Sequence, residues 1–214
     1  MKVKPGNPPM TKVRRRRRKD ARPAEIIEAA RAVFVDYGFA AARTGDIAAR
    51  AGVSKGLIYV YFPTKEALFE AVVRSNLLSV LDTTAAAVLA ADRTVTASAQ
   101  LRLVIEMLYR ELVGTERRRI LHLVIAEGPR FPHLAEFYHR EVITRGRALL
   151  RGIIERGVAR GEFRSTGLER NPEILIAPAL VAVIWNLMFA SFEPLDLDAY
   201  FDLHLGAALD ALRP

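Results

Sequence analysis

The chain has 214 residues, 51% of them hydrophobic, which is enough to bury a sizeable core in one large domain or two small ones. It contains no cysteine, which excludes disulfides, zinc fingers, iron–sulfur clusters and thiol nucleophiles and is compatible with a reducing cytoplasm. The formal net charge is +8, but the first twenty residues alone carry nine Lys or Arg and one Asp, so the globular part of the chain is close to neutral.

Residues 1–20 are rich in Pro, Lys and Arg and show no apolar periodicity, which predicts a disordered basic arm. This arm could follow a phosphate backbone or enter a minor groove, and a solvated tail that only aids solubility is the alternative. Its unbroken cationic run consists of Arg14, Arg15, Arg16, Arg17, Arg18 and Lys19. No secretory signal is predicted, because charged residues rather than an apolar segment follow the basic start.

Residues 21–66 are predicted to form three short helices. An amphipathic helix over residues 22–37, with Tyr37 on its apolar stripe, should stop at Gly38. A second helix should begin at Thr44, whose hydroxyl can accept a hydrogen bond from a backbone N–H.

The stretch from residue 44 to residue 65 has the pattern of a helix-turn-helix. Gly52 falls where a helix ends in the left-handed conformation, and Ser54 can cap a new helix from Lys55 to about Phe62. Ile58 and Phe62 would pack inward, which leaves the opposite face available to the major groove of DNA.

Residues 67–214 show helical periodicity and no convincing strand pattern, which predicts an all-α fold. Pro63 and Thr64 should end the recognition helix and start a longer one at Lys65. Asn171 should cap an apolar helix that Pro178 kinks. Other helices are predicted over residues 94–113, 116–127 and 133–160, and from Asp196 or Asp198 to about Leu212.

Residues 174–192 carry no charge and are long enough to be considered as a membrane span. Pro178, Asn186 and Ser191 interrupt this stretch, and no Lys or Arg anchors flank it. The preferred interpretation is therefore a helix buried on all sides, in a core or in a subunit interface, and no membrane partner is expected.

The sequence from Ile26 to Val73, IIEAARAVFVDYGFAAARTGDIAARAGVSKGLIYVYFPTKEALFEAVV, resembles the DNA-binding domain of the TetR family of bacterial transcriptional regulators. The D-I-A, A-G-V-S-K-G, Y-x-Y-F and K-E-A-L motifs occur in the family order and spacing. The segment HLVIAEGPRFPHLAEFYHRE, residues 122–141, resembles the C-terminal domain of the AefR-like branch. The resemblance implies an N-terminal three-helix DNA-binding domain and, over residues 67–214, a larger helical domain for effector binding and dimerisation.

The resemblance also implies which residues contact double-stranded DNA. Phosphate contacts are implied for Thr44, Tyr59, Tyr61 and Lys65 and base contacts for Lys55, Gly56 and Leu57, and the predicted set also includes Arg43, Gly45 and Ser54. Leu57 stands where Thr is frequent in the family and Gly45 where some members carry a base-reading Arg, so direct readout should be sparse. Helix packing is the alternative for the two tyrosines, and solvated surface is the alternative for the two lysines.

A homodimer is expected, because one short recognition helix reads too few base pairs. The two DNA-binding domains of a dimer read half-sites about 34 to 36 Å apart or a multiple of that spacing. The candidates for the interface are residues 174–192 and the last helix, with Leu205, Leu209 and Leu212. Alternatively, one of these helices fills the core of its own chain.

The resemblance further implies that a small molecule binds among the middle helices. An apolar or aromatic effector is expected, because few fixed charges fall on the apolar stripes. The candidate polar contacts, each of which could instead be a core or surface residue, are Tyr109, His122, Tyr138, His139, Trp185 and Asn186.

No enzyme, cofactor or metal site is predicted, because the four His are scattered and no P-loop, G-x-S-x-G or Rossmann glycine pattern occurs. The expected function is that of a cytoplasmic, sequence-specific transcriptional regulator, a ligand-responsive repressor that acts as a homodimer on a palindromic operator. The alternative is a less specific module that binds RNA or a membrane surface through its Arg-rich arm.

Overall fold

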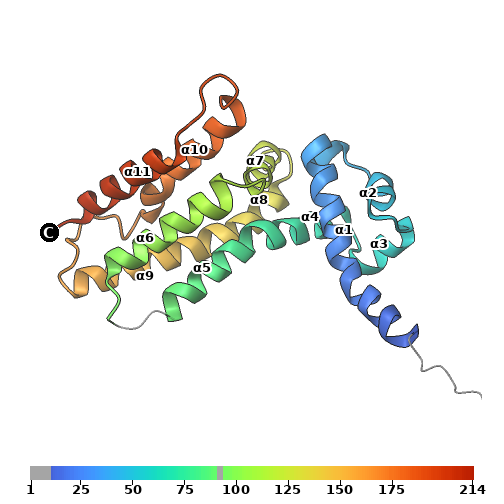
Figure 1. Ribbon diagram of the computed structural model, residues 1–214, viewed down its shortest axis with the longest axis horizontal. Helices are drawn as coiled ribbons and strands as arrows, with labels where there is room; N and C mark the ends of the chain where they lie inside the picture. The colour runs from blue at the N-terminus through green and yellow to red at the C-terminus, as the bar shows by residue number, and fades with distance from the viewer. Residues whose placement is uncertain (1–10, 91–93) are drawn as a thin grey trace, which may run out of the picture. The chain divides into compact units, whose positions relative to one another are not determined.

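A computed structural model describes the backbone of residues 11–90 and 94–214 and the side chains of residues 22–90 and 94–214. Within these ranges all regular structure is helical and no strand occurs, as Figure 1 shows, so the predicted all-α fold is confirmed. The chain divides into an N-terminal unit that ends at Val72 and a C-terminal unit from Val73 to Pro214.

The N-terminal unit contains α1 (Thr11–Ala41), α2 (Thr44–Ala51), α3 (Lys55–Tyr61) and most of α4 (Lys65–Val73). The backbone of α1 is interrupted at Gly38, where φ is 75° and ψ is 166°, so the predicted break is confirmed. Its start differs from the prediction, because residues 11–20 are helical rather than an irregular arm. Lys and Arg are good helix formers even where apolar periodicity is absent. The side chains of Arg14–Lys19 lie outside those described.

Three phenylalanines form the centre of the N-terminal core. The rings of Phe34, Phe39 and Phe69 lie 5.2 to 5.8 Å apart, and Phe69 meets the other two in edge-on geometry. Ile47 of α2 and Ile58 of α3 are also fully buried. The predicted inward position of Tyr37 is wrong, since this side chain is 63% exposed. The break at Gly38 redirects the chain, and Phe39 takes the buried aromatic position instead.

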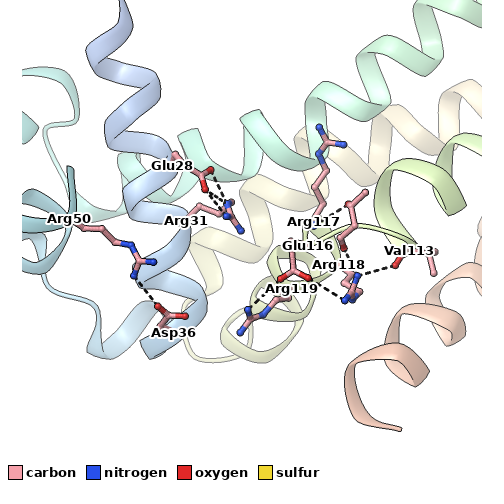
Figure 2. A network of polar contacts seen from close by, with 10 residues as sticks. Glu28, Arg31, Asp36, Arg50, Val113, Glu116, Arg117, Arg118 and Arg119 are labelled. Atoms are coloured by element: carbon pink, nitrogen blue, oxygen red, sulfur yellow. Dashed lines mark hydrogen bonds and ion pairs between the residues drawn. The ribbon is translucent and has the colours of Figure 1, made fainter. Parts of the chain in front are cut away.

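Two of the ion pairs on the surface of this unit appear in Figure 2. Arg50 of α2 lies 3.1 Å from Asp36 of α1, so it connects the two helices. Arg31 donates to Glu28 within α1, and these hydrogen bonds lower the pKa of the Glu28 carboxyl. Exposed pairs of this kind contribute about 0 to 1 kcal/mol each, so the aromatic core dominates the stability of the unit.

The C-terminal unit consists of helices and the segments that connect them. Its α-helices are α5 (Ser79–Ala90), α6 (Ala97–Met107), α7 (Arg117–Glu127), α8 (Pro132–Tyr138), α9 (Thr144–Ala159), α10 (Ala177–Met188) and α11 (Leu197–Leu212). Three π-helical segments, η1 (Arg74–Leu78), η2 (Leu108–Val113) and η3 (His139–Ile143), and the 3-10 segment η4 (Pro172–Ile176) complete it. Helix α6 packs against both α5 and α9, and α10 packs against α11.

Side-chain caps fix several helix starts. Thr96 accepts from the Ala99 N–H at 3.1 Å to start α6, and Asp196 accepts from the Ala199 N–H at 3.1 Å to start α11. Of the two Asp residues proposed from the sequence, Asp196 is therefore the cap. Arg118, at the start of α7, donates to the carbonyl oxygens of Val113 and Thr115 and thereby closes the turn before this helix (Figure 2).

The long helix predicted from Lys65 is confirmed, since residues 65–90 form one helical run of 26 residues that includes η1. By length and composition alone this run could cross a membrane, and apolar core helices commonly share that property. The other apolar stretch, residues 174–192, contains a 12-residue helix, α10, which is too short to span.

One sequence prediction for residues 174–192 is wrong. Pro178 does not kink a long helix, because it lies in the first turn of α10, where its missing N–H has no intrahelical role. The predicted burial on all sides, in a core or in a subunit interface, is not reached within one chain, and burial in an interface stays a prediction. Val181, Ile184 and Met188 are 50%, 46% and 58% exposed, so one apolar face of α10 is uncovered.

Candidate DNA-binding surface and effector cavity

The turn between α2 and α3 has the geometry that the sequence predicts. Gly52 adopts the left-handed conformation, with φ 62° and ψ 36°, and its N–H donates to the carbonyl oxygen of Ala49. The Ser54 hydroxyl accepts from the N–H of Leu57 at 3.2 Å and caps α3. These two features end one helix and begin the next within three residues, which confirms the helix-turn-helix.

Helix α3 presents one face outward. Ile58 is 1% exposed and anchors the helix on the core, whereas Lys55, Gly56 and Tyr59 are exposed. Phe62, predicted to be buried, is only half-buried because the helix ends before it. Lys55 forms no hydrogen bond or ion pair with the part of the chain whose side chains are described, so its ammonium is available to an external acceptor.

The predicted DNA-contacting glycines are not required by packing within the protein. A Cβ atom added at Gly45 or at Gly56 would meet no heavy atom within 4 Å of it. Both residues are exposed on helices, where Gly is less favourable than Ala by about 1 kcal/mol. Their small size therefore leaves room for a close approach from outside the chain.

Thr44 and Tyr59 are brought together although they belong to different helices. The Thr44 Oγ1 and Tyr59 Oη atoms lie 3.4 Å apart. The prediction that Thr44 caps α2 is wrong, because the N-cap is Arg43, which makes no side-chain capping bond, and Thr44 is the first helical residue. Two adjacent hydroxyls beside the exposed Arg43 form a polar edge suited to a phosphate.

Lys65 has a structural role that the sequence did not reveal. Its ammonium donates to the carbonyl oxygens of Phe39 at 2.9 Å, Ala40 at 3.2 Å and Ala42 at 3.3 Å, and lies 4.6 Å from the centre of the Phe39 ring. An ammonium has three hydrogens, and three carbonyls at the end of α1 account for them. A phosphate contact from Lys65 would have to replace one of these bonds. Tyr61 is half-buried, with its ring 6.5 Å from that of Phe62, and its predicted contact stays a prediction.

The C-terminal unit contains a cavity of about 270 Å³. Its walls come from the helical run that includes η1 and α5, from α6, η2 and α7, from α8, η3 and α9, and from η4 and α10. Most lining side chains are apolar, and Leu77, Leu81, Leu112, Leu121, Val142 and Leu150 are examples. The size and composition suit an apolar small molecule.

Four polar side chains line the cavity: Thr84, Tyr138, Arg147 and Glu173. The Thr84 hydroxyl donates to the Val80 carbonyl oxygen at 2.8 Å, within its own helix. Burial raises the pKa of the Tyr138 hydroxyl to about 12, so this group remains protonated and able to donate at neutral pH.

The two charged lining residues face each other. Arg147 Nη1 lies 3.4 Å from Glu173 Oε1, and Arg147 Nη2 donates to the Arg170 carbonyl oxygen at 2.9 Å. The second carboxylate oxygen of Glu173, Oε2, is buried and has no hydrogen-bond partner in the described part of the chain. The cavity wall thus carries one balanced ion pair and one unsatisfied acceptor.

Of the six predicted effector-binding residues, only Tyr138 lines this cavity. His122 and His139 are exposed, and the other three use their polar atoms within the fold. Tyr109 bonds to His204, the Trp185 indole N–H donates to the Glu193 carbonyl oxygen at 2.7 Å, and the Asn186 amide donates to the Ala182 carbonyl oxygen at 3.0 Å.

Sequence reasoning missed Arg147 and Glu173. Arg147 could have been found, because it follows Ile143 by four residues and precedes Leu150 by three, so it occupies a position on the apolar stripe. A charge at such a position indicates a polar point in an otherwise apolar wall. Glu173 carried no such signal, because only the folded chain brings η4 to α9.

Comparison with known families gives two matches. Residues 26–72 match the family described as "Bacterial regulatory proteins, tetR family", and residues 91–202 match "Tetracyclin repressor-like, C-terminal domain". The second match covers more than half of the chain and does not identify the AefR-like branch. Together the matched segments include α2, α3 and most of the elements that line the cavity.

Individual relatives are described as transcriptional regulators. The repressor KstR2 of Rhodococcus jostii is 29% identical over 198 residues, which are 91% of this chain and 92% of KstR2. The regulator YfiR of Bacillus subtilis is 39% identical over 59 residues, and these cover 28% of this chain and 29% of YfiR. The short match thus concerns one part of the protein, whereas the KstR2 match runs along its length.

Solved structures share the fold. A putative TetR-family regulator from Mesorhizobium loti superposes with a TM-score of 0.75 at 23% identity and covers 92% of this chain and 99% of its own. FadR from Bacillus subtilis, solved in complex with stearoyl-CoA, superposes with a TM-score of 0.69 at 21% identity and covers 89% of this chain and 99% of its own.

Proposed function

The chain belongs to the TetR family of bacterial regulatory proteins, a family of DNA-binding transcriptional regulators, and we propose that it acts as a homodimeric repressor on a palindromic operator. The relatives are regulators rather than enzymes. The observation that carries the proposal is the face of α3 on which Lys55, Gly56 and Tyr59 are exposed while Ile58 anchors the helix.

In this proposal, α3 enters the major groove and the start of α2 contacts the backbone. Lys55 donates to a base edge, Gly56 permits a close approach, and Leu57 meets apolar surface such as a thymine methyl. The adjacent hydroxyls of Thr44 and Tyr59 contact phosphate. Arg14–Lys19 add sequence-independent affinity, so removal of residues 1–19 should flatten the salt dependence of binding.

The dimer interface proposed here is the uncovered apolar face of α10 together with α11. Val181, Ile184 and Met188 of α10 are about half exposed, and Leu203 of α11 is 75% exposed. Helices α10 and α11 pack against each other, so these side chains belong to adjacent elements. A two-fold axis through this face would bury it in a four-helix arrangement, two helices from each copy.

The proposed effector is an apolar small molecule that occupies the cavity. FadR was solved with stearoyl-CoA, whose acyl chain is apolar, and the cavity wall here is almost entirely aliphatic. Leu77, Val80 and Leu81 of the wall belong to the helical run that begins at Lys65. A ligand that displaces these side chains would act on the helix that leads from the DNA-binding unit.

A second contact supports coupling through this helix. Arg74 of η1 lies 3.5 Å from Glu141 of η3, and its guanidinium stands 4.8 Å from the centre of the Phe137 ring. Tyr138, Val142 and Ile143, from the same stretch of helix, line the cavity. Movement of η3 would thus be passed to the start of the C-terminal unit through Arg74.

Competition binding tests the proposal. The full-length protein is titrated with duplex DNA from the region upstream of its own gene, against random duplex DNA, RNA and anionic vesicles. The proposal predicts that the upstream duplex binds at least about a thousandfold more tightly than random duplex, as specific regulators do. Equal binding to all four would favour a non-specific polyanion-binding module and would contradict the proposal.

A further inference from the structure

The polar groups of the cavity wall restrict the chemistry of a ligand beyond its being apolar. Arg147 and Glu173 carry opposite charges and pair at 3.4 Å. A cavity that is empty or holds an uncharged molecule therefore has no uncompensated charge on its wall. A ligand carboxylate drawn to Arg147 would also meet the like charge of Glu173, and a ligand ammonium drawn to Glu173 would also meet the like charge of Arg147. Either would add an unbalanced charge to a wall that is otherwise almost entirely apolar.

The unsatisfied carboxylate oxygen of Glu173 can accept a hydrogen bond from a ligand. Glu173 Oε2 is buried without a partner among the described residues, and a buried acceptor left unpaired destabilises the protein. A ligand hydroxyl or amide N–H would satisfy it with a hydrogen bond to a charged acceptor, which is stronger than one between neutral groups.

Tyr138 is a second polar side chain, further along the same cavity wall. Tyr138 precedes Arg147 by nine residues on the continuous helical stretch of α8, η3 and α9, so the two are about 13 Å apart along the axis. Gly146 and Val142 line the cavity between them. The Tyr138 hydroxyl makes no hydrogen bond with the described residues, and it can therefore donate to a ligand acceptor.

We propose that the effector is an uncharged, elongated apolar molecule with a hydrogen-bond donor at the end that meets Glu173 and a hydrogen-bond acceptor at the end that meets Tyr138. This inference rests on the proposed function of the cavity as an effector site. It deepens that function by assigning the ligand's charge, its length and the polar group at each end.

A matched series of probes tests the inference by calorimetry on the full-length protein. Methyl 10-hydroxydecanoate has a donor at one end and an ester acceptor at the other. Methyl decanoate lacks the donor, 10-hydroxydecanoic acid is an anion, and methyl 10-aminodecanoate is a cation. We expect the hydroxy ester to bind about tenfold more tightly than each of the others, the effect of one hydrogen bond to a charged acceptor.

Two variants identify the groups responsible. Glu173→Leu should bring the hydroxy ester and methyl decanoate to within about threefold of each other while methyl decanoate still binds, which also shows that the variant is folded. Tyr138→Phe should weaken the binding of both esters by a similar factor, because each carries the ester group that accepts from the Tyr138 hydroxyl. Glu155→Gln, at an exposed position on α9 away from the cavity, is the matched control and should leave all four affinities unchanged.

Several results would overturn the inference. These are a charged probe that binds as tightly as the hydroxy ester, equal binding of all four probes, binding by none of them, or a preference for the hydroxyl that survives Glu173→Leu. Binding of the protein to its upstream duplex, measured in the same preparation, tests the proposed function separately. A protein that binds that duplex and shows any of these results retains the regulator function and loses this assignment of the ligand.

Discussion

The hydroxyl of Tyr109 lies 3.0 Å from Nδ1 of His204, and Nε2 of the same ring lies 2.7 Å from the carbonyl oxygen of Leu175. A carbonyl oxygen can only accept, so Nε2 carries the proton, Nδ1 accepts, and the tyrosine hydroxyl donates. Tyr109 and His204 are 7% and 5% exposed. This buried relay joins η2 and η4, which line the cavity, to α11, which we place in the dimer interface.

Removal of the tyrosine hydroxyl should destabilise the protein. Tyr109→Phe leaves Nδ1 of His204 buried without its donor, which should lower the free energy of unfolding by about 1 to 3 kcal/mol. Urea unfolding followed by circular dichroism measures this change. Tyr37→Phe, at a position 63% exposed, is the matched control and should change the stability by less than about 0.5 kcal/mol. Equal stability of the two variants would contradict the relay.

The relay also predicts how stability depends on pH. Burial lowers the pKa of His204 below its ordinary value of 6.5, so the folded state favours the neutral ring. Well above pH 6.5 the ring is neutral in both states, so it adds no pH dependence to the stability. Below pH 6.5 the unfolded state binds the proton first, so stability should fall as the pH decreases toward the lowered pKa. Unfolding of the protein and of His204→Gln from pH 7.5 to 5 should show a shallower loss in the variant, and parallel curves would refute this.

Two lysines of the DNA-binding unit should behave differently when substituted. Lys65→Met removes three bonds from an ammonium to the carbonyls at the end of α1, which should cost about 1.5 to 3 kcal/mol of stability. Lys55→Ala removes an exposed side chain and should leave stability within about 0.5 kcal/mol while weakening operator binding by about 1 to 3 kcal/mol. Thermal unfolding and fluorescence anisotropy separate the two effects. An unchanged melting temperature for Lys65→Met would rule out its structural role.

Gly56→Ala should separate protein stability from DNA binding. The added methyl group meets no protein atom within 4 Å, and Ala is the better helix former, so stability should rise by up to about 1 kcal/mol. Operator affinity should fall at least about tenfold if the backbone of α3 approaches the bases closely at this position. Gly45→Ala is the comparison at the other predicted contact. A more stable Gly56→Ala protein with unchanged affinity would show that Gly56 does not face DNA.

The proposed interface predicts a change in oligomeric state. Val181→Asp combined with Leu203→Asp places two charges on the uncovered face of α10 and α11, and their burial between copies would be costly. Sedimentation should detect a dimer in the parent protein and a dissociation constant raised at least about tenfold in the variant. Leu89→Asp, at a 78% exposed site on α5, is the control and should leave the dimer intact.

The helix-turn-helix could be predicted from sequence almost residue by residue, because its signals are local. Gly52 provides the left-handed residue and Ser54 provides the cap, and neither depends on distant parts of the chain. Lys65 could not be assigned in this way. Its partners lie 23 to 26 residues earlier in the chain. A lysine that bonds to backbone carbonyls cannot be told, from the sequence, from one that bonds to phosphate.

The proposed effector cavity was less predictable for the same reason. The apolar character of its wall followed from the periodic helices, but the polar contacts depend on which helices meet. Tyr109, Trp185 and Asn186 were plausible from their residue types, yet each is used in an internal hydrogen bond. The exposed face of α10 shows a related limit, because sequence alone does not say whether an apolar helix is covered by its own chain or by another.

Selection of bound duplexes from a random pool tests whether two copies of α3 read one operator. A homodimer that reads DNA with two copies of α3 should enrich a palindromic consensus, with half-sites separated by one helical turn or a multiple of it. The double Asp variant of α10 and α11 should lose this enrichment under the same conditions. A consensus without two-fold symmetry, or no enriched sequence at all, would contradict the proposal that this protein is a dimeric operator-binding regulator.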